Sequence, residues 1–330
     1  MDSTLATGDG KRSRKINGAA FLKNNVVFFV MLALLIVSSM ISSAFFTTQN
    51  IFNLLRQLTP PTLLAMGMLF VILTGGIDLS VGSVVAMSAV FTAHFLQTSG
   101  LPVTILLVVL IAAAFGAFNG YLVARRRLAP FVVTLAGMTI ARGIAFIVSR
   151  GMPTRITNEA LLNFAIARFL GVPHIVWFAL VVVAVLVVVQ RFTVFGRFVQ
   201  AIGSNETSVM LSGINASFYK ISVYVISAVL SAIGGIVIAS RVGLGTPLAG
   251  AEMELDAIAA VVIGGASLAG GRGTVLKTLM GVLVLGMIGN IMNLLNVPSY
   301  PQQVLQGVII IVAVLLQSGR KSKDISSSTR

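Results

Sequence analysis

Cysteine is absent from this chain of 330 residues, and charged side chains are scarce. Without cysteine the chain can form no disulfide framework, no thiolate metal site and no thiol nucleophile. Charged residues make up only 10% of the sequence, whereas a soluble protein carries about a quarter. The shortage of charge excludes a soluble domain of any size.

Apolar residues take the place of the missing charge, because 57% of the sequence is hydrophobic. Stretches of about 20 such residues, long enough to cross a bilayer, recur along almost the whole length. We therefore predict an all-α polytopic membrane protein with about ten transmembrane helices. The expected spans are 26–44, 51–73, 78–97, 101–123, 129–149, 175–190, 219–240, 254–270, 275–296 and 301–317.

Lysine and arginine are distributed unevenly between the two sides of these spans. With the N-terminus inside, 17 of the 23 cations belong to the cytoplasmic side. The outer side receives Arg150, Arg155, Arg168 and Arg241. This bias is the one that the positive-inside rule describes. We expect a multi-pass protein of the bacterial inner membrane, surrounded by lipid, with both termini cytoplasmic. The net charge of +14 then sets orientation, and no nucleic-acid partner is expected.

The chain is expected to form one membrane domain, residues 26–317. A basic cytoplasmic tail, 1–25, precedes it, and a second cytoplasmic tail, 318–330, follows it. Two longer polar segments interrupt the spans. Residues 150–174 are expected outside and residues 191–218 inside.

The span 254–270 is the weakest of the ten. Its apolar part is short and contains Gly264, Gly265 and Gly270. Without this crossing the basic C-terminal residues would lie outside, against the charge bias. We therefore keep it as a short or broken crossing. A helix broken by glycine is tolerated in lipid only when protein or a water-filled cavity covers it.

A two-turn helix is predicted within the cytoplasmic segment, at residues 205–213. Ser204 or Asn205 can cap its start, Glu206 suits the positive N-terminal end, and Gly213 suits the position after the C-terminus. The helix also carries three apolar side chains, Val209, Met210 and Leu211, on a side of the membrane without lipid beside them. They either pack back on the bundle or face a cytoplasmic partner.

Five segments resemble the permeases of ribose-type sugar importers. They are Thr74-Gly75-Gly76-Ile77-Asp78-Leu79-Ser80-Val81-Gly82-Ser83, Asn119-Gly120-Tyr121-Leu122-Val123, Pro130-Phe131-Val132-Val133-Thr134-Leu135, residues 196–215, and residues 255–274 with Leu255-Asp256-Ala257 and Leu268-Ala269-Gly270-Gly271-Arg272-Gly273-Thr274. The similarity extends in order over roughly residues 45–315.

The resemblance implies the membrane subunit of an ATP-binding-cassette (ABC) importer that translocates a monosaccharide, such as a pentose, a hexose or a small polyol. It implies a fold similar to cobalamin-type importer permeases. The implied partners are a cytoplasmic ABC ATPase, a periplasmic sugar-binding protein and a second permease subunit, identical or a sister chain. It also implies that the helix at 205–213 is the coupling helix that docks into the ATPase.

Five polar residues are candidates for the translocation pathway or its gate: Asp78, Asn119, Arg142, Asp256 and Asn290. Each has a structural alternative. Asp78 could cap the following helix, and Arg142, near mid-membrane, could bind carbonyl groups or a carboxylate. The two asparagines could bond across helices rather than to sugar hydroxyls. Asp256 could belong to a solvated acidic entrance or contact the binding protein.

The chain carries no recognisable catalytic or metal site, and no cofactor is expected. Residues 271–278 imitate a phosphate-binding loop, but Leu276 replaces the second glycine that such a loop requires. ATP hydrolysis is therefore expected from a separate subunit. The rival class is an ion- or proton-coupled secondary transporter, which would usually place an ionisable relay deep in its spans. Arg142 is the single candidate, and no carboxylate lies mid-span.

A short glycine pattern occurs twice in the sequence. Gly75-Gly76-x-x-Leu79-x-x-Gly82 recurs as Gly264-Gly265-x-x-Leu268-x-x-Gly271. Such a recurrence is consistent with internal duplication, although a chain with 32 glycines repeats short glycine patterns easily.

Overall fold

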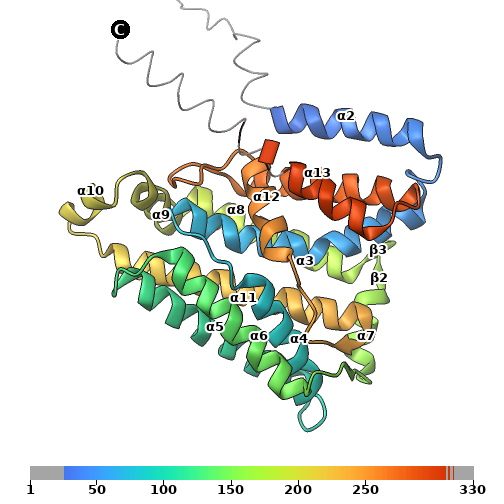
Figure 1. Ribbon diagram of the computed structural model, residues 1–330, viewed down its shortest axis with the longest axis horizontal. Coiled ribbons are helices and arrows are strands. Elements are labelled where there is room, and N and C mark those ends of the chain that lie inside the picture. The colour runs from blue at the N-terminus through green and yellow to red at the C-terminus, as the bar shows by residue number, and fades with distance from the viewer. Residues whose placement is uncertain (1–25, 310, 313–314, 316–330) are drawn as a thin grey trace, which may run out of the picture.

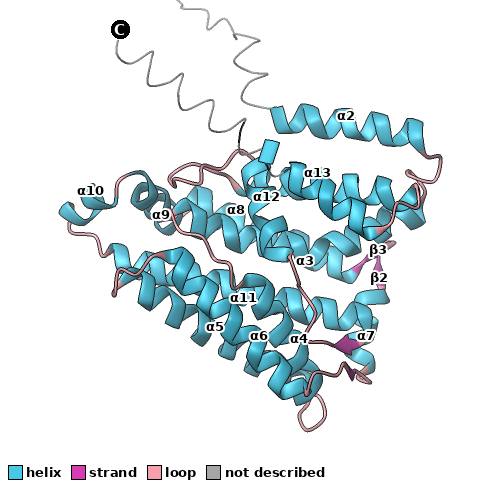
Figure 2. Cartoon of the chain, in the orientation of Figure 1, coloured by secondary structure: helices cyan, strands magenta, loops and turns pink. Residues whose placement is uncertain are grey.

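The computed structural model describes residues 26–309, 311–312 and 315, and its regular structure is almost entirely helical (Figure 1, Figure 2). The helices are α2 Val26–Ile41, α3 Thr48–Leu73, α4 Val81–Phe95, α5 Leu101–Ala124, α6 Pro130–Ser149, α7 Glu159–Ile166, α8 His174–Phe192, α9 Val194–Ser204, α10 Glu206–Leu211, α11 Ala216–Val242, α12 Met253–Ile263 and α13 Val275–Leu294. Residues 299–309 are also helical. The predicted tails 1–25 and 318–330 lie outside the described residues.

Four two-residue strands form the remaining regular structure of the described chain. β1 Thr154–Arg155 pairs antiparallel with β4 Leu244–Gly245, and β2 Arg168–Phe169 pairs with β3 Val172–Pro173. Figure 1 shows α7 and the β2–β3 hairpin at one end of the molecule and α9 and α10 at the other. The two long polar connections, 150–174 and 191–218, therefore lie at opposite ends, as expected for opposite sides of a membrane.

Each of the ten predicted spans overlaps a helix of the described chain, although part of the last, at 310, 313–314 and 316–317, lies outside the described residues. Six helices, α3, α5, α6, α8, α11 and α13, are long and apolar enough to cross a membrane. The helices α2 and α4 are apolar but shorter. The remaining two predicted spans correspond to α12 and to the helix that begins at residue 299. The prediction of an all-α polytopic membrane protein is confirmed.

The helix α3 lies at the centre of the bundle. Leu63 and the residues that follow it to Leu73 are fully buried. On one side α3 packs against α4 and α11, and α11 also packs against α5. On the other side it packs against α12 and α13, and α2 covers α13. Pro60 and Pro61 lie inside this helix without interrupting it.

The helix α12 is short, as its glycines predict. Its 11 residues rise about 16 Å at about 1.5 Å each, half of the roughly 30 Å bilayer core. The preceding residues, 243–252, are irregular apart from the two residues of β4. Gly245 and Gly250 lie against α4, where an added Cβ would collide with backbone of Ala89 and Gly82. This irregular backbone is covered by protein, which makes it tolerable at membrane depth.

The helices α3 and α12 end in the same way. Gly75 and Gly265 both adopt positive φ, 81° and 83°. In α3 the N–H groups of Gly75 and Gly76 donate to Ile72 and Val71, and in α12 the N–H groups of the corresponding residues, 265 and 266, donate to residues 262 and 261. Both ends are Schellman motifs, which need glycine at the left-handed position. These equivalent ends are offset by one residue from the repeated glycine pattern, which aligns Gly75 with Gly264 and not with Gly265.

Candidate functional site

The predicted two-turn helix is α10, six residues long. The side chain of Asn205 accepts a hydrogen bond from the N–H of Ser208 at 2.9 Å, which makes it the N-cap. Gly213 has φ +79°, and its N–H donates to the carbonyl of Met210. The cap and the glycine therefore act as the sequence predicts.

The three apolar side chains of α10 do not share one environment. Val209 is 8% exposed and packs with Ile202 and Ala216 in a small core. Met210 is 44% exposed and Leu211 is 84% exposed. Of the two alternatives, Val209 takes the first, because its side chain packs back on the bundle and holds α10 onto α9 and α11. Met210 and Leu211 form the free apolar surface.

An ion pair fixes α10 to the bundle. Lys220 of α11 donates to the carboxylate of Glu206, and this is the single salt bridge within the described residues. Glu206 lies in the first turn of α10, where a negative charge is favourable. The helix is thus held by a cap, an ion pair and one buried valine, with Met210 and Leu211 facing outward.

A close backbone contact connects this region to the centre of the bundle. Gly203, near the end of α9, lies so near to Leu73 and Gly271 that an added Cβ would collide with their backbone atoms. The N–H of Gly271 also donates to the carbonyl of Leu73 at 2.9 Å. We call these three residues the glycine junction. It joins α9 to the end of α3 and to the α12–α13 connection.

Asp78 lies in a buried polar cluster near the start of α4. Its carboxylate accepts from the backbone N–H of Ser80 at 3.0 Å and from the hydroxyl of Ser227 in α11 at 2.9 Å. The hydroxyl of Ser80 donates to the same carboxylate and accepts from the amide of Asn119 in α5 at 3.2 Å. Asp78, Ser80, Asn119 and Ser227 are each at most 2% exposed. The cluster binds α4, α5 and α11 together.

Arg142 holds the irregular segment that precedes α12. Its guanidinium donates to the carbonyl oxygen of Pro247 at 2.7 Å and to that of Ala249 at 2.9 Å. These carbonyls lie in non-helical backbone, so they accept no hydrogen bond of the helical type. An arginine inside a membrane bundle needs such acceptors. The structure therefore places Arg142 on backbone carbonyls.

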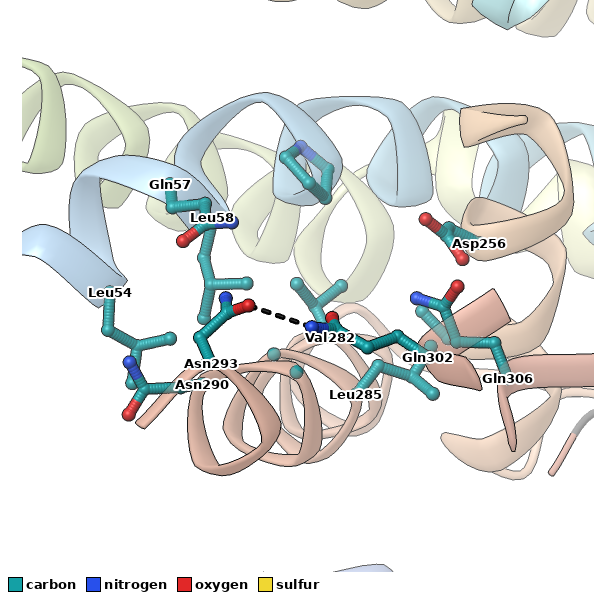
Figure 3. A pocket seen from close by; sticks show the side chains of 14 residues that line it. Leu54, Gln57, Leu58, Asp256, Val282, Leu285, Asn290, Asn293, Gln302 and Gln306 are labelled. Carbon is teal, nitrogen blue, oxygen red and sulfur yellow. Dashed lines mark hydrogen bonds between the residues drawn. The ribbon is translucent and has the colours of Figure 1, made fainter. Parts of the chain in front are cut away.

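A cavity of about 160 Å³ lies between α3, α12, α13 and the helix that begins at residue 299 (Figure 3). Six of the residues that line it carry an amide or a carboxylate: Gln57, Asp256, Asn290, Asn293, Gln302 and Gln306. Leu54, Leu58, Val282 and Leu285 line it as well. The cavity thus combines apolar walls with hydrogen-bonding groups on all four helices.

The five candidate pathway residues fall into three places. Asp256 and Asn290 line the cavity. Asp78 and Asn119 belong to the buried cluster, and Arg142 binds the loop carbonyls. Four polar lining residues were not among the predicted site residues: Gln57, Asn293, Gln302 and Gln306. For the last two, the spacing of four residues, which puts both amides on one face of a helix, was the signal that could have revealed them.

Comparisons with known proteins show the family of the chain. Residues 50–314 match the family model described as the branched-chain amino acid transport system permease component. The chain is 40% identical to the ribose import permease RbsC of Haemophilus influenzae over 287 residues, which covers 85% of this chain and 88% of the relative.

Two further relatives are named for ribose and for L-arabinose. RbsC of Bacillus subtilis is 42% identical over 276 residues, covering 83% of this chain and 86% of the relative. The L-arabinose ABC transporter permease AraH of Azospirillum brasilense is 38% identical over 280 residues, covering 84% and 83%. No solved structure matches the chain significantly. The chain is a multi-pass transport permease and belongs to the ribose-type family of ABC importer permeases.

Proposed function

We propose that this chain is the membrane subunit of a bacterial importer for ribose or a closely similar monosaccharide. The support for the sugar comes from the relatives named for ribose, which match over most of both chains. The remaining components would be an ABC ATPase in the cytoplasm, a periplasmic binding protein and a second permease subunit. The membrane would be the inner membrane, with both termini in the cytoplasm.

The observation that carries the coupling to an ATPase is the geometry of α10. Its start is capped by Asn205, and its position is fixed by the Glu206–Lys220 pair. It presents Met210 and Leu211 at the end of the molecule where α9 and α10 project (Figure 1). An exposed apolar pair on an ordered helix away from lipid suits a protein partner better than water. We infer that α10 is the helix that the ATPase binds.

The basic residues support the same orientation. Arg125, Arg126 and Arg127 follow α5 directly. The hydroxyl of Ser217, at the start of α11, donates to the carbonyl of Ala124 at 3.3 Å, which places the α5 end beside the α10–α11 connection. The positive-inside rule then assigns this whole end of the bundle to the cytoplasm.

Reconstitution tests the proposal. The permease and its ATPase are reconstituted in liposomes that present the periplasmic side outward and enclose ATP. The binding protein is added outside. Uptake of D-ribose should require ATP and all three components. The control is the same complex with an ATPase that binds but does not hydrolyse ATP. Uptake by the permease alone under a proton or sodium gradient would instead establish a secondary transporter.

A further inference from the structure

The cavity between α3, α12, α13 and residues 302–306 contains polar groups that no neighbour satisfies. Among the described residues, the side chains of Gln57, Asp256 and Gln306 form no hydrogen bond. Figure 3 shows Asp256 and Gln306 on facing sides of the cavity, with their polar ends toward each other. Asp256 and Gln306 are half-buried and Gln57 is exposed. The three side chains converge on one cavity and are available to bind a ligand there.

Other polar groups around the cavity are already paired, and they hold its walls in place. The amides of Asn50 and Asn290 exchange two hydrogen bonds of 2.9 Å, which join the start of α3 to α13. The amide of Gln302 donates to Asn293 and to the carbonyl of Val297, both at 2.9 Å. The helices are thus fixed by one set of amides, and a different set remains free.

The helix α3 contributes one more acceptor at the same place. Proline has no N–H, so Pro61 cannot donate to the carbonyl of Gln57, four residues earlier. Both residues line the cavity. The carbonyl oxygen of Gln57 therefore lacks its usual helical partner beside its own free side chain. The wall of α3 offers both donors and acceptors.

The chemistry of the lining favours a neutral polyhydroxyl ligand. Amide side chains both donate and accept, as sugar hydroxyls do, and one carboxylate can accept from two adjacent hydroxyls. The apolar side chains Leu58, Val282 and Leu285 can cover the C–H face of a sugar ring. None of the described residues that line the cavity is a lysine or an arginine. A phosphate or carboxylate group would lack a cation there and would be repelled by an ionised Asp256.

We propose that this cavity binds one neutral monosaccharide within the permease itself, with Asp256 and Gln306 as the residues that select its hydroxyls. The proposal deepens the proposed import of ribose and rests on it for the identity of the sugar. Recognition of the solute would then not belong to the binding protein alone. The permease would bind the released sugar between α3, α12 and α13 before it reaches the cytoplasm.

Saturation-transfer NMR on the purified full-length permease in detergent micelles tests the proposal with D-ribose as the probe. The wild-type protein should give a ribose signal that reaches a plateau as the ribose concentration rises. Gln306→Leu and Asp256→Asn should each weaken binding by about tenfold, because each removes at least one hydrogen bond to the sugar. Gln97→Leu, the same change at an exposed residue of the α4–α5 connection, should leave binding unchanged. D-Ribose 5-phosphate should not compete.

Several results would overturn the proposal: no signal with the wild-type protein, an equal signal in both cavity variants, or equal competition by the phosphate. Thermal melting identifies a variant that is unfolded, and the other variant then decides. Transport by the full complex separates this inference from the proposed function. Ribose binding without ribose uptake would refute the importer and leave the site intact. Ribose uptake that both cavity variants support at the wild-type rate would refute the site and leave the importer intact.

Discussion

The different environments of Val209 and Leu211 allow the docking role of α10 to be tested within one short helix. Leu211→Asp changes a side chain that is 84% exposed, and Val209→Ala changes one that is 8% exposed. If α10 binds the ATPase, the first change should affect association and the second should affect the permease itself. Each variant is therefore the control for the other.

The expected magnitudes follow from burial. Complete burial of a leucine contributes about 1.5–3 kcal/mol. Scaled by its exposed fraction, docking of Leu211 can contribute about 1.3–2.5 kcal/mol, or roughly 10- to 70-fold in Kd. Leu211→Asp should weaken ATPase binding by at least about tenfold, since the partner would also bury a carboxylate. Val209→Ala should lower the stability of the permease by about 1–2 kcal/mol through lost burial and a small cavity.

The assay measures binding of the purified ATPase to the permease in lipid nanodiscs, beside the melting temperature of each permease variant. The expected pattern is weaker binding at an unchanged melting temperature for Leu211→Asp. Val209→Ala should show a lower melting temperature and nearly unchanged binding. The reverse pattern, or wild-type ATPase binding by Leu211→Asp, would show that α10 is not the docking helix.

Three further predictions concern topology, the glycine junction and the irregular segment. Reporter fusions after Arg127, Gly203 and Arg330 should all give a cytoplasmic signal, and a periplasmic signal at Arg330 would show that one crossing is miscounted. Gly203→Val should abolish ribose uptake with ATPase binding retained, because a side chain there collides with the carbonyl of Leu73; normal uptake would refute the close contact. Arg142→Leu should lower the melting temperature, because each carbonyl left without a partner costs about 1–3 kcal/mol of stability. Arg142→Lys should restore part of the lost stability. An unchanged melting temperature in Arg142→Leu would contradict the role of these bonds.

The helices and their ends could be predicted from the sequence because their causes are local. An apolar run of about 20 residues must be helical in lipid, since every backbone group needs a partner within the segment. The cap at Asn205 and the glycines at 213 and 264–265 act within a few residues of their own position. The fold class, the short α12 and the bounds of α10 depend on nothing further away.

The features that could not be predicted depend on which helices become neighbours. Val209 differs from Leu211 in burial because Ile202 and Ala216 lie beside it, and no local pattern specifies that contact. The same holds for Arg142, whose acceptors are more than 100 residues away. Asp256 and Gln306 meet across a cavity formed by four helices. Polar residues in apolar spans indicated where function could lie, but only the packing separated the paired groups from the free ones.

The glycine junction connects a displacement of α10 to the helices around the proposed sugar site. The helix α10 follows α9 directly, and Gly203 of α9 lies against Leu73 and Gly271 without space for a side chain. Leu73 ends α3, and Gly271 lies in the connection from α12 to α13. These three helices form most of the cavity wall. Close-packed backbone contacts transmit displacement because they have no void to absorb it. A shift of α10 by the ATPase would therefore move the ends of α3, α12 and α13 at the junction, whose opposite parts surround the cavity.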